Sequence, residues 1–301
     1  MRTAYLGTSE FAATVLRRLA GSRHRPALVV TPPDRRQGRG RKVAPPPAAV
    51  AAAELGLELL QAENVNEEGA LERIRAARPE AVLVCAFGQL IREPLLSELP
   101  ILNVHPSLLP RWRGAAPIER AIMARDETTG VCVMRLTAGL DSGPIALRQE
   151  VPLDPEEDFA SLSARLAELG GDLLVHALDL QAEGALAFVE QEEDGVTYAE
   201  KIEPAERRLD PSQPAAELAA KVRALTPHVG AYLETAEGER LGVRKARPAG
   251  ADVPQGALEA RDRTLLLGCG EGTLQLDVVQ PPGSKAMPAD AYLRGHEPPR
   301  L

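Results

Sequence analysis

Cysteines are few in this sequence, and long apolar runs are absent. The three cysteines, Cys85, Cys132 and Cys269, lie far apart in apolar or glycine-rich segments. This spacing excludes a disulfide framework and a cysteine zinc site, and it indicates reduced, buried thiols of a cytosolic protein. No apolar run approaches the roughly 20 residues of a membrane span. Residues 4–6 are already strand-like and no basic, apolar leader precedes them, so we expect a cytoplasmic protein.

A dinucleotide fingerprint is also missing. Residues 2–6 are typical of a first strand, and a turn at residues 7–9 and a helical pattern over residues 10–20 follow, with Ser9 as the N-cap. This order is typical of a parallel α/β fold. The turn reads GTSEFA, however, and lacks the GxGxxG pattern that binds a dinucleotide pyrophosphate. We therefore predict no NAD site.

The length of 301 residues suffices for about two domains, and the hydrophobic and charged fractions, 44% and 26%, are ordinary for a globular protein. In the first half of the chain, apolar runs alternate with helical patterns, which predicts a Rossmann-like, doubly wound parallel sheet. Gly170 and Gly171 are expected to weaken or kink the longest helix. Strands are expected at residues 27–30, 57–60, 81–87, 101–104 and 131–136, and helices at residues 48–55, 67–77, 115–123 and 159–182.

The pattern changes in the last third of the chain. Pro214 can open a helix with Leu218, Val222 and Leu225 on one face. The strand-like pieces that follow are short, and many short strands predict a small β-barrel. They lie at residues 229–234, 241–246, 264–267 and 273–279. We expect a first domain over residues 1–188, a linker over residues 189–205 and a second domain over residues 206–301.

The net charge of −8 is distributed unevenly. Residues 151–203 hold fourteen acidic and two basic residues, a net charge of −12, which leaves +4 for the rest of the chain. Residues 31–42 carry five basic residues against Asp34 alone. A basic segment on an acidic protein is compatible with a nucleic-acid partner, and its alternative is a solvated surface loop.

The most specific stretch is NVHPSLLPRWRG at residues 103–114. An apolar run leads into it, and Pro106 and Pro110 restrict the loop that follows. Asn103 and His105 are two residues apart, so on an extended strand both side chains point to the same face. In an open α/β sheet, ligands bind beyond the carboxyl ends of the strands, where His105 is expected.

These side chains can be interpreted as an acyl-transfer site without a nucleophile. The Asn103 amide would donate to a carbonyl oxygen as charge develops on it, while His105, oriented by Asp141 of the later GLDSG turn, would transfer a proton. Alternatively, His105 is a structural histidine and Asp141 only a turn residue. Ser107 could be a nucleophile with His105 and Asp141, but it lacks a GxSxG elbow and lies very near His105 in the chain.

Residues 103–118, NVHPSLLPRWRGAAPI, and GLDSG at residues 139–143 resemble the signature of the folate-dependent formyltransferases. The resemblance implies that Asn103, His105 and Asp141 surround the formyl group of 10-formyltetrahydrofolate, with no metal. It further implies that an amine attacks the formyl carbon directly. The folate site is implied to comprise Phe87, Ser107, Leu108, Leu109 and Pro110. Phe87 stands where the family often has tyrosine, which alters hydrogen bonding near the folate.

Other segments are similar to the methionyl-tRNA formyltransferase family over nearly the whole chain. They are GTSEFA (7–12), TPPDRRQGRGRK (31–42), YAEKI (198–202) and PPGSKAM (281–287), although Ser9 and Glu10 replace a frequent Pro-Asp. The similarity implies a Rossmann-like catalytic domain, a linker, and an OB-like domain that helps to bind initiator Met-tRNA. We expect a cytoplasmic monomer that binds no membrane.

The tRNA contacts implied by this resemblance are Arg35, Arg36, Arg39, Arg41, Lys42, Arg244, Lys245, Arg247 and Lys285. Trp112 could stack on a nucleobase or anchor its own loop. Two other functions stay open at this point. The same chemistry could serve a sugar nucleotide or glycinamide ribonucleotide, or the chain could be an RNA-binding module with a vestigial catalytic domain.

Overall fold

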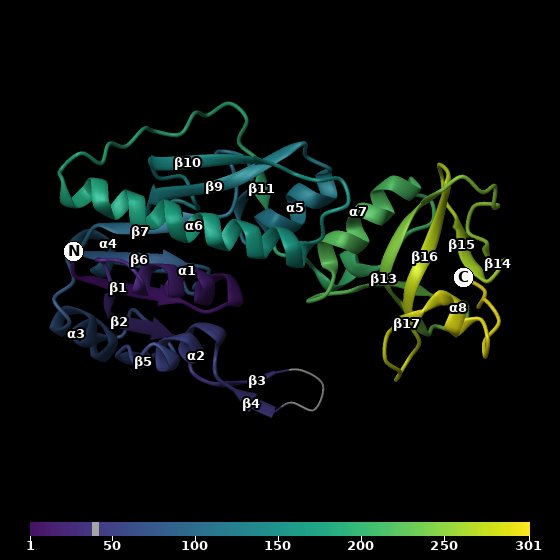
Figure 1. Ribbon diagram of the computed structural model, residues 1–301, viewed down its shortest axis with the longest axis horizontal. Helices are drawn as coiled ribbons and strands as arrows, with labels where there is room; N and C mark the ends of the chain where they lie inside the picture. The colour runs from purple at the N-terminus through teal and green to yellow at the C-terminus, as the bar shows by residue number, and fades with distance from the viewer. Residues whose placement is uncertain (38–41) are drawn as a thin grey trace. The chain divides into compact units, whose positions relative to one another are not determined.

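The computed structural model describes residues 1–37 and 42–301 (Figure 1), so Arg39 and Arg41 lie outside the described residues. The described chain divides into two compact units. The first comprises Met1–Gly114, Thr129–Val151 and Ser163–Tyr198, and the second comprises Ala115–Thr128, Pro152–Leu162 and Ala199–Leu301. Because two internal segments group with the C-terminal part, the chain passes between the units more than once. The domain boundaries expected at residues 188 and 205 stay a prediction.

Within the described residues, seven strands form the main sheet in the order β10-β9-β7-β6-β1-β2-β5. The strands from β7 to β5 are parallel, and β9 joins β7 antiparallel. β1, β6 and β7 are buried along their whole length, which explains the continuous apolar sequence of β6 and the apolar residues on either side of Asn103 in β7. The strands are β1 (Thr3–Gly7), β2 (Pro26–Thr31), β5 (Leu59–Gln61), β6 (Ala81–Cys85), β7 (Ile101–His105), β9 (Thr128–Arg135) and β10 (Ile145–Pro152).

The predicted Rossmann-like fold class is confirmed, with a mixed edge to the sheet. No apolar run marks β10 in the sequence, because all of its side chains are half-buried or exposed. Two further pairs of short strands lie outside this sheet. They are the antiparallel hairpin β3 (Arg35–Gln37) and β4 (Lys42–Ala44), and β8 (Arg113–Gly114) with β11 (Tyr198–Ala199).

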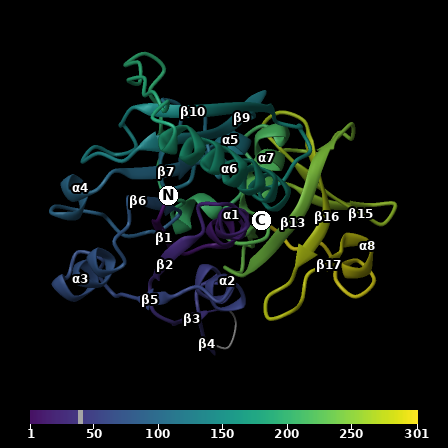
Figure 2. The same cartoon turned by 60° about the vertical axis from the view of Figure 1, so that its left-hand side comes forward.

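Helices cover both faces of this sheet (Figures 1 and 2). On one face, α3 and α4 pack on even-numbered residues of β1 such as Ala4 and Leu6. On the other face, α1 and α6 lie together. As predicted, Ser9 caps α1 by accepting a hydrogen bond from Ala12 N. The helices are α1 (Glu10–Ala20), α2 (Pro47–Glu54), α3 (Glu68–Ala76), α4 (Leu95–Glu98) and α6 (Phe159–Ala182).

The two glycines of α6 lie where the helix meets its neighbours. A Cβ atom on Gly170 would lie 2.8 Å from Val104 Cγ1 of β7, and one on Gly171 would lie 2.7 Å from Arg18 Cβ of α1. Both distances are below normal contact. The glycines therefore allow α6 to approach β7, the strand that carries Asn103 and His105, and α1.

We expect Gly170→Leu to lower the free energy of unfolding by about 1–3 kcal/mol, because the added side chain would overpack the buried contact with Val104. Urea denaturation followed by circular dichroism measures this change. Gly69→Leu is the matched control: Gly69 is exposed in α3 and a Cβ there meets nothing within 4 Å. This control is expected to stabilise the helix by up to about 1 kcal/mol through its higher helix propensity. Equal stability changes in the two variants would contradict the packing role of Gly170.

The second unit contains an antiparallel sheet in the order β12-β13-β16-β15-β14, with β17 paired to β16. As predicted, α7 buries Leu218, Val222 and Leu225 in a core shared with these strands. The elements are α5 (Pro117–Ala124), a 3-10 helix (Pro204–Arg207), α7 (Ala215–Leu225), β12 (Ala231–Glu234), β13 (Arg240–Ala249), β14 (Leu258–Arg261), β15 (Thr264–Gly268), β16 (Thr273–Gln280), β17 (Met287–Pro288) and α8 (Ala289–Tyr292). None of the helices in the described part of the chain is both long and apolar enough to span a membrane.

Candidate active site

Asn103 and His105 lie at the carboxyl end of β7, and their side chains share one face of the strand. Both are nearly buried, with 8% and 4% of their surface exposed. No hydrogen bond of the Asn103 side chain occurs among the residues described by the structure. The Asn103 amide is therefore a donor that the local structure does not use.

His105 has a defined orientation. Its Nε2 atom lies 2.9 Å from the carbonyl oxygen of Trp112, and since a carbonyl can only accept, Nε2 carries the hydrogen. Its Nδ1 atom faces Asp141, 3.7 Å from Oδ2. In the neutral imidazole, Nδ1 thus holds the lone pair, on the side of a carboxylate that would stabilise the protonated ring.

Asp141 is held in a turn by contacts from two segments. Its backbone φ is +43°, in the left-handed region that side chains rarely adopt. Oδ2 accepts a hydrogen bond of 2.9 Å from the backbone N–H of Gly114. The turn carbonyls of Asp141 and Gly143 accept hydrogen bonds from the Gln191 side chain, each 2.8 Å long. The carboxylate that the sequence pairs with His105 therefore lies beside it.

Ser107 does not act as a partner of the His105 imidazole. Its hydroxyl donates to the carbonyl oxygen of Arg111 at 2.7 Å, and its side chain is fully buried. This geometry does not support the serine-nucleophile interpretation. Burial also raises the pKa of the Cys132 thiol to about 11 and that of Cys85 to about 12, so neither is a nucleophile at neutral pH.

The residues predicted to bind folate differ in their accessibility. Leu109 is buried against Cys132 and Met134, whereas Leu108 and Pro110 are partly exposed on the loop after β7. Phe87 belongs to the core on the α3 side of the sheet. Its backbone carbonyl, not its ring, accepts a hydrogen bond of 2.6 Å from the Thr8 hydroxyl.

Trp112 is anchored through its backbone. Its N–H donates to the Thr197 hydroxyl at 2.9 Å, and its carbonyl accepts from His105. The guanidinium carbon of Arg111 lies 4.3 Å from the centre of its ring. These contacts favour the interpretation that Trp112 anchors its loop.

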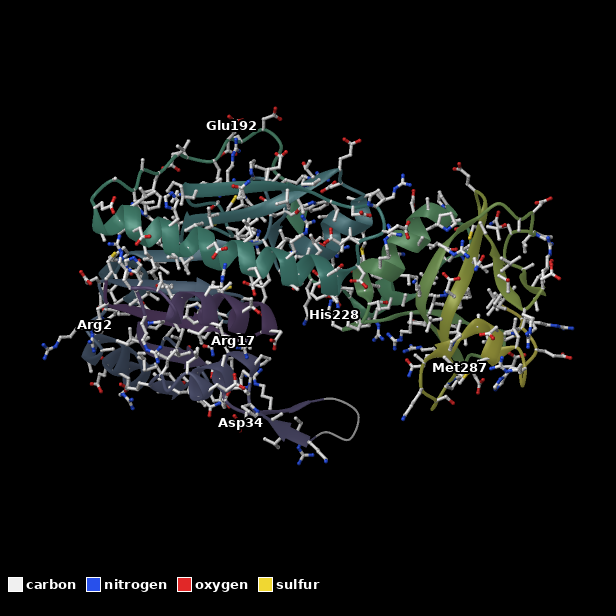
Figure 3. The ribbon with its side chains drawn as sticks, in the orientation of Figure 1. Arg2, Arg17, Asp34, Glu192, His228 and Met287 are labelled. Atoms are coloured by element: carbon white, nitrogen blue, oxygen red, sulfur yellow. The ribbon has the colours of Figure 1, made fainter. Side chains whose placement is uncertain are left out.

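Of the residues predicted to bind tRNA in the first unit, the structure describes Arg35 and Arg36 on β3 and Lys42 on β4, and Asp34 precedes β3 (Figure 3). Arg35, Arg36 and Lys42 are exposed. A guanidinium nitrogen of Arg35 lies 3.6 Å from the Glu63 carboxylate. Since this pair is exposed, it contributes little to stability and leaves the arginine accessible.

Four residues of the second unit were predicted to bind tRNA. Arg244 donates from Nε and Nη2 to Gln280 Oε1, at 3.0 and 2.6 Å, so its guanidinium is engaged within the sheet. Lys245, Arg247 and Lys285 are exposed. Arg247 also lies 3.4 Å from the Asp277 carboxylate. In the part of the chain that the structure describes, neither lysine has a partner.

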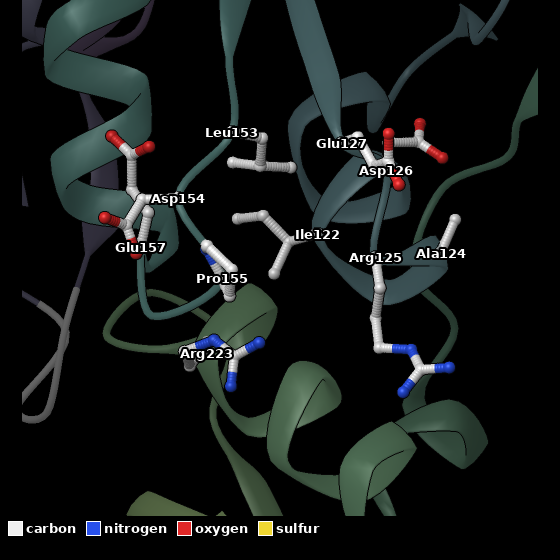
Figure 4. A pocket seen from close by; sticks show the side chains of 10 residues that line it. All are labelled: Ile122, Ala124, Arg125, Asp126, Glu127, Leu153, Asp154, Pro155, Glu157 and Arg223. Atoms are coloured by element: carbon white, nitrogen blue, oxygen red, sulfur yellow. The ribbon is translucent and has the colours of Figure 1, made fainter.

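A cavity of about 470 Å³ in the second unit contains none of the predicted site residues (Figure 4). Its apolar wall includes Ile122, Leu153 and Pro155, and the Arg223 guanidinium points toward it. Arg223 Nε is buried without a hydrogen-bond partner among the described residues. No cluster of three or more potential metal ligands occurs within residues 1–37 and 42–301.

Comparison with known proteins identifies the family. Residues 1–178 match the family described as formyl transferase, and residues 201–297 match its C-terminal domain. The methionyl-tRNA formyltransferase of Methylococcus capsulatus is 42% identical over 301 residues, which cover 98% of this chain and 97% of the relative. That of Methylobacillus flagellatus is 40% identical over 299 residues, with the same coverage.

Solved structures share the fold at low sequence identity. WlaRD, a sugar 3N-formyl transferase, has a TM-score of 0.68 at 14% identity and covers 95% of this chain and 99% of its own. HypX from Aquifex aeolicus in complex with tetrahydrofolic acid has a TM-score of 0.67 at 18% identity and covers 97% of this chain and 47% of its own. With both domain matches and relatives of about 40% identity along its length, this chain belongs to the methionyl-tRNA formyltransferase family.

Proposed function

We propose that the protein transfers the formyl group of 10-formyltetrahydrofolate to the α-amino group of methionine on initiator Met-tRNA, giving N-formylmethionyl-tRNA for translation initiation. The family membership and the tetrahydrofolate complex of HypX support this donor and acceptor. The observation that carries the chemistry is the orientation of His105, whose unprotonated Nδ1 faces Asp141 while Asn103 lies on the same strand face.

Asn103 is proposed to stabilise the oxyanion. When the methionine nitrogen attacks the formyl carbon, a carbon–nitrogen bond forms and negative charge develops on the formyl oxygen. An amide donor without another partner is preorganised to bind the charged oxygen, and it stabilises that charge most strongly in a site from which water is excluded. The near-complete burial of Asn103 supports this role.

His105 is proposed to transfer the proton. The attacking amine becomes acidic as it bonds to carbon, and Nδ1 can accept its proton because Nε2 already carries one. The Asp141 carboxylate, 3.7 Å away, would stabilise the imidazolium. The proton then passes to the folate nitrogen as its bond to the formyl carbon breaks. No step needs a covalent enzyme intermediate.

The division of labour between the domains is also part of the proposal. We assign catalysis to residues 1–188, a linking role to residues 189–205 and tRNA binding to an OB-like domain over residues 206–301. In that domain we assign phosphate contacts to Lys245, Arg247 and Lys285, and an internal role to the Arg244 guanidinium because it binds Gln280. Arg35, Arg36, Arg39, Arg41 and Lys42 would contact the acceptor arm.

An Arg36→Ala variant tests the role of the basic hairpin. We expect it to raise KM for initiator Met-tRNA about 3- to 10-fold, as for the loss of one exposed phosphate contact, and to reduce the salt dependence of tRNA binding by about one counterion. KM for the folate should stay unchanged. Arg92→Ala, which also removes an exposed arginine, is the matched control. Equal losses for tRNA and folate would contradict the assignment.

The decisive assay compares three formyl acceptors with 10-formyltetrahydrofolate as donor: initiator Met-tRNA, elongator Met-tRNA and a small amine such as an amino sugar nucleotide. Rapid transfer confined to the initiator is expected. Transfer to the small amine alone would retain the chemistry and overturn the tRNA substrate. Binding of tRNA without any transfer would favour the vestigial-domain alternative.

A further inference from the structure

We propose that Gln191 is a positioning residue that holds the Asp141 turn in register with His105. The inference rests on the proposed function, since it concerns the same catalytic pair. Gln191 lies outside both signature segments, in the acidic stretch that the sequence presents as a linker.

The Gln191 amide is fully used in three contacts. Nε2 donates one hydrogen to the carbonyl of Asp141 and the other to that of Gly143, each at 2.8 Å. Oε1 accepts from Arg113 Nε at 3.0 Å. One side chain thus links the turn that carries Asp141 to the segment that precedes Gly114, whose N–H binds the Asp141 carboxylate.

The Asp141 turn needs such support. Asp141 adopts a positive φ, which costs a side-chain-bearing residue of order 1 kcal/mol, and such a conformation persists only where surrounding contacts determine it. The preceding residue, Leu140, is 61% exposed, so packing does not hold this side of the turn. The two hydrogen bonds from Gln191 therefore supply a restraint that the local sequence lacks.

The same segment also supports the His105 side of the pair. Thr197, six residues after Gln191, accepts from Trp112 N–H through its hydroxyl at 2.9 Å and from Arg113 N–H through its carbonyl at 2.9 Å. Trp112 in turn accepts the Nε2 hydrogen of His105. Residues 191–197 thus contact the segments that hold each member of the His105–Asp141 pair, whereas Glu192 between them is exposed (Figure 3).

Gln191→Met tests this role, because methionine keeps the length of the side chain and removes all three hydrogen bonds. We expect kcat to fall about 10- to 100-fold, as a displacement of about 1 Å in a catalytic group can cause. KM for both substrates should change less than about threefold. Glu192→Gln, at the exposed neighbour, should leave all three quantities unchanged.

A second measurement separates this proposal from the proposed function. The 15N chemical shifts of the His105 ring, identified by their absence in His105→Asn, report the environment of the ring without any turnover. We expect these chemical shifts to change in Gln191→Met and to match those of the parent in Glu192→Gln. Unchanged chemical shifts in Gln191→Met would overturn the positioning role, even if kcat fell. If the parent formylates no Met-tRNA, the proposed function fails while the chemical shifts still test Gln191.

Discussion

An Asn103→Ala variant is expected to formylate Met-tRNA with a kcat about 10²- to 10³-fold below that of the parent protein. Loss of one preorganised oxyanion donor typically costs this much. The donor has no other partner among the described residues, so alanine removes a function without leaving a broken hydrogen bond behind. Steady-state and single-turnover formylation measure the change, and KM for either substrate should vary little because the interaction strengthens only in the transition state.

Asn103→Asp provides a matched comparison. The side chain keeps its shape but replaces the amide donor with a carboxylate, which repels a developing oxyanion. We expect its kcat to be at least as low as that of Asn103→Ala, with a cooperative thermal unfolding transition retained in both variants. A kcat within about threefold of the parent in the alanine variant would show that Asn103 does not stabilise the transition state.

His105→Ala is expected to lower kcat about 10²- to 10⁴-fold, the range for loss of a general acid–base group. The physical reason is specific to Nδ1, which in the neutral ring accepts the proton while the Trp112 carbonyl fixes Nε2–H. Single-turnover formylation of initiator Met-tRNA by the parent and the variant measures this loss.

Added imidazole is the control for His105→Ala. If the loss reflects a missing proton acceptor, millimolar imidazole should restore part of the activity in a pH-dependent manner. Methylation of both ring nitrogens removes the lone pair, so 1,3-dimethylimidazolium should restore none. A kcat within about threefold of the parent in His105→Ala, or equal rescue by both compounds, would contradict the mechanism.

Local patterns predicted several elements closely. The helix expected over residues 10–20 is α1, and the helix expected over residues 159–182 is α6. α1 has a side-chain cap, and both helices have apolar residues at helical spacing. These signals depend on residues within a few positions of one another in the chain. β10 and β14 were not predicted because their side chains are half-buried or exposed and form no apolar run. The expectation that Gly170 and Gly171 weaken or kink α6 did not consider a second reason for glycine in a helix, which is close packing against neighbouring elements.

The residues of the candidate site also divide into those that local sequence predicts and those that only the structure reveals. The two-residue spacing of Asn103 and His105 determines that both face one side of β7, since strand geometry has a period of two. The pairing of Asp141 with His105 was proposed from the chemistry of a carboxylate and an imidazole, and the family resemblance implied it as well, but no spacing rule predicts that the two side chains meet. No sequence pattern indicates a role for Gln191, because the residues that it contacts lie 48, 50 and 78 positions away from it in the chain.

The sequence by itself determined the fold class, the alternation of strands and helices, and the face shared by Asn103 and His105. Only the tertiary structure decided which His105 nitrogen carries the hydrogen, that Nδ1 faces Asp141, and that residues 191–197 hold the segments around both. The physical reason is the distance along the chain over which each kind of interaction acts. Propensity, capping and periodicity act within one or two turns of chain, whereas the orientation of a catalytic side chain depends on hydrogen bonds that exist only after distant segments have packed together.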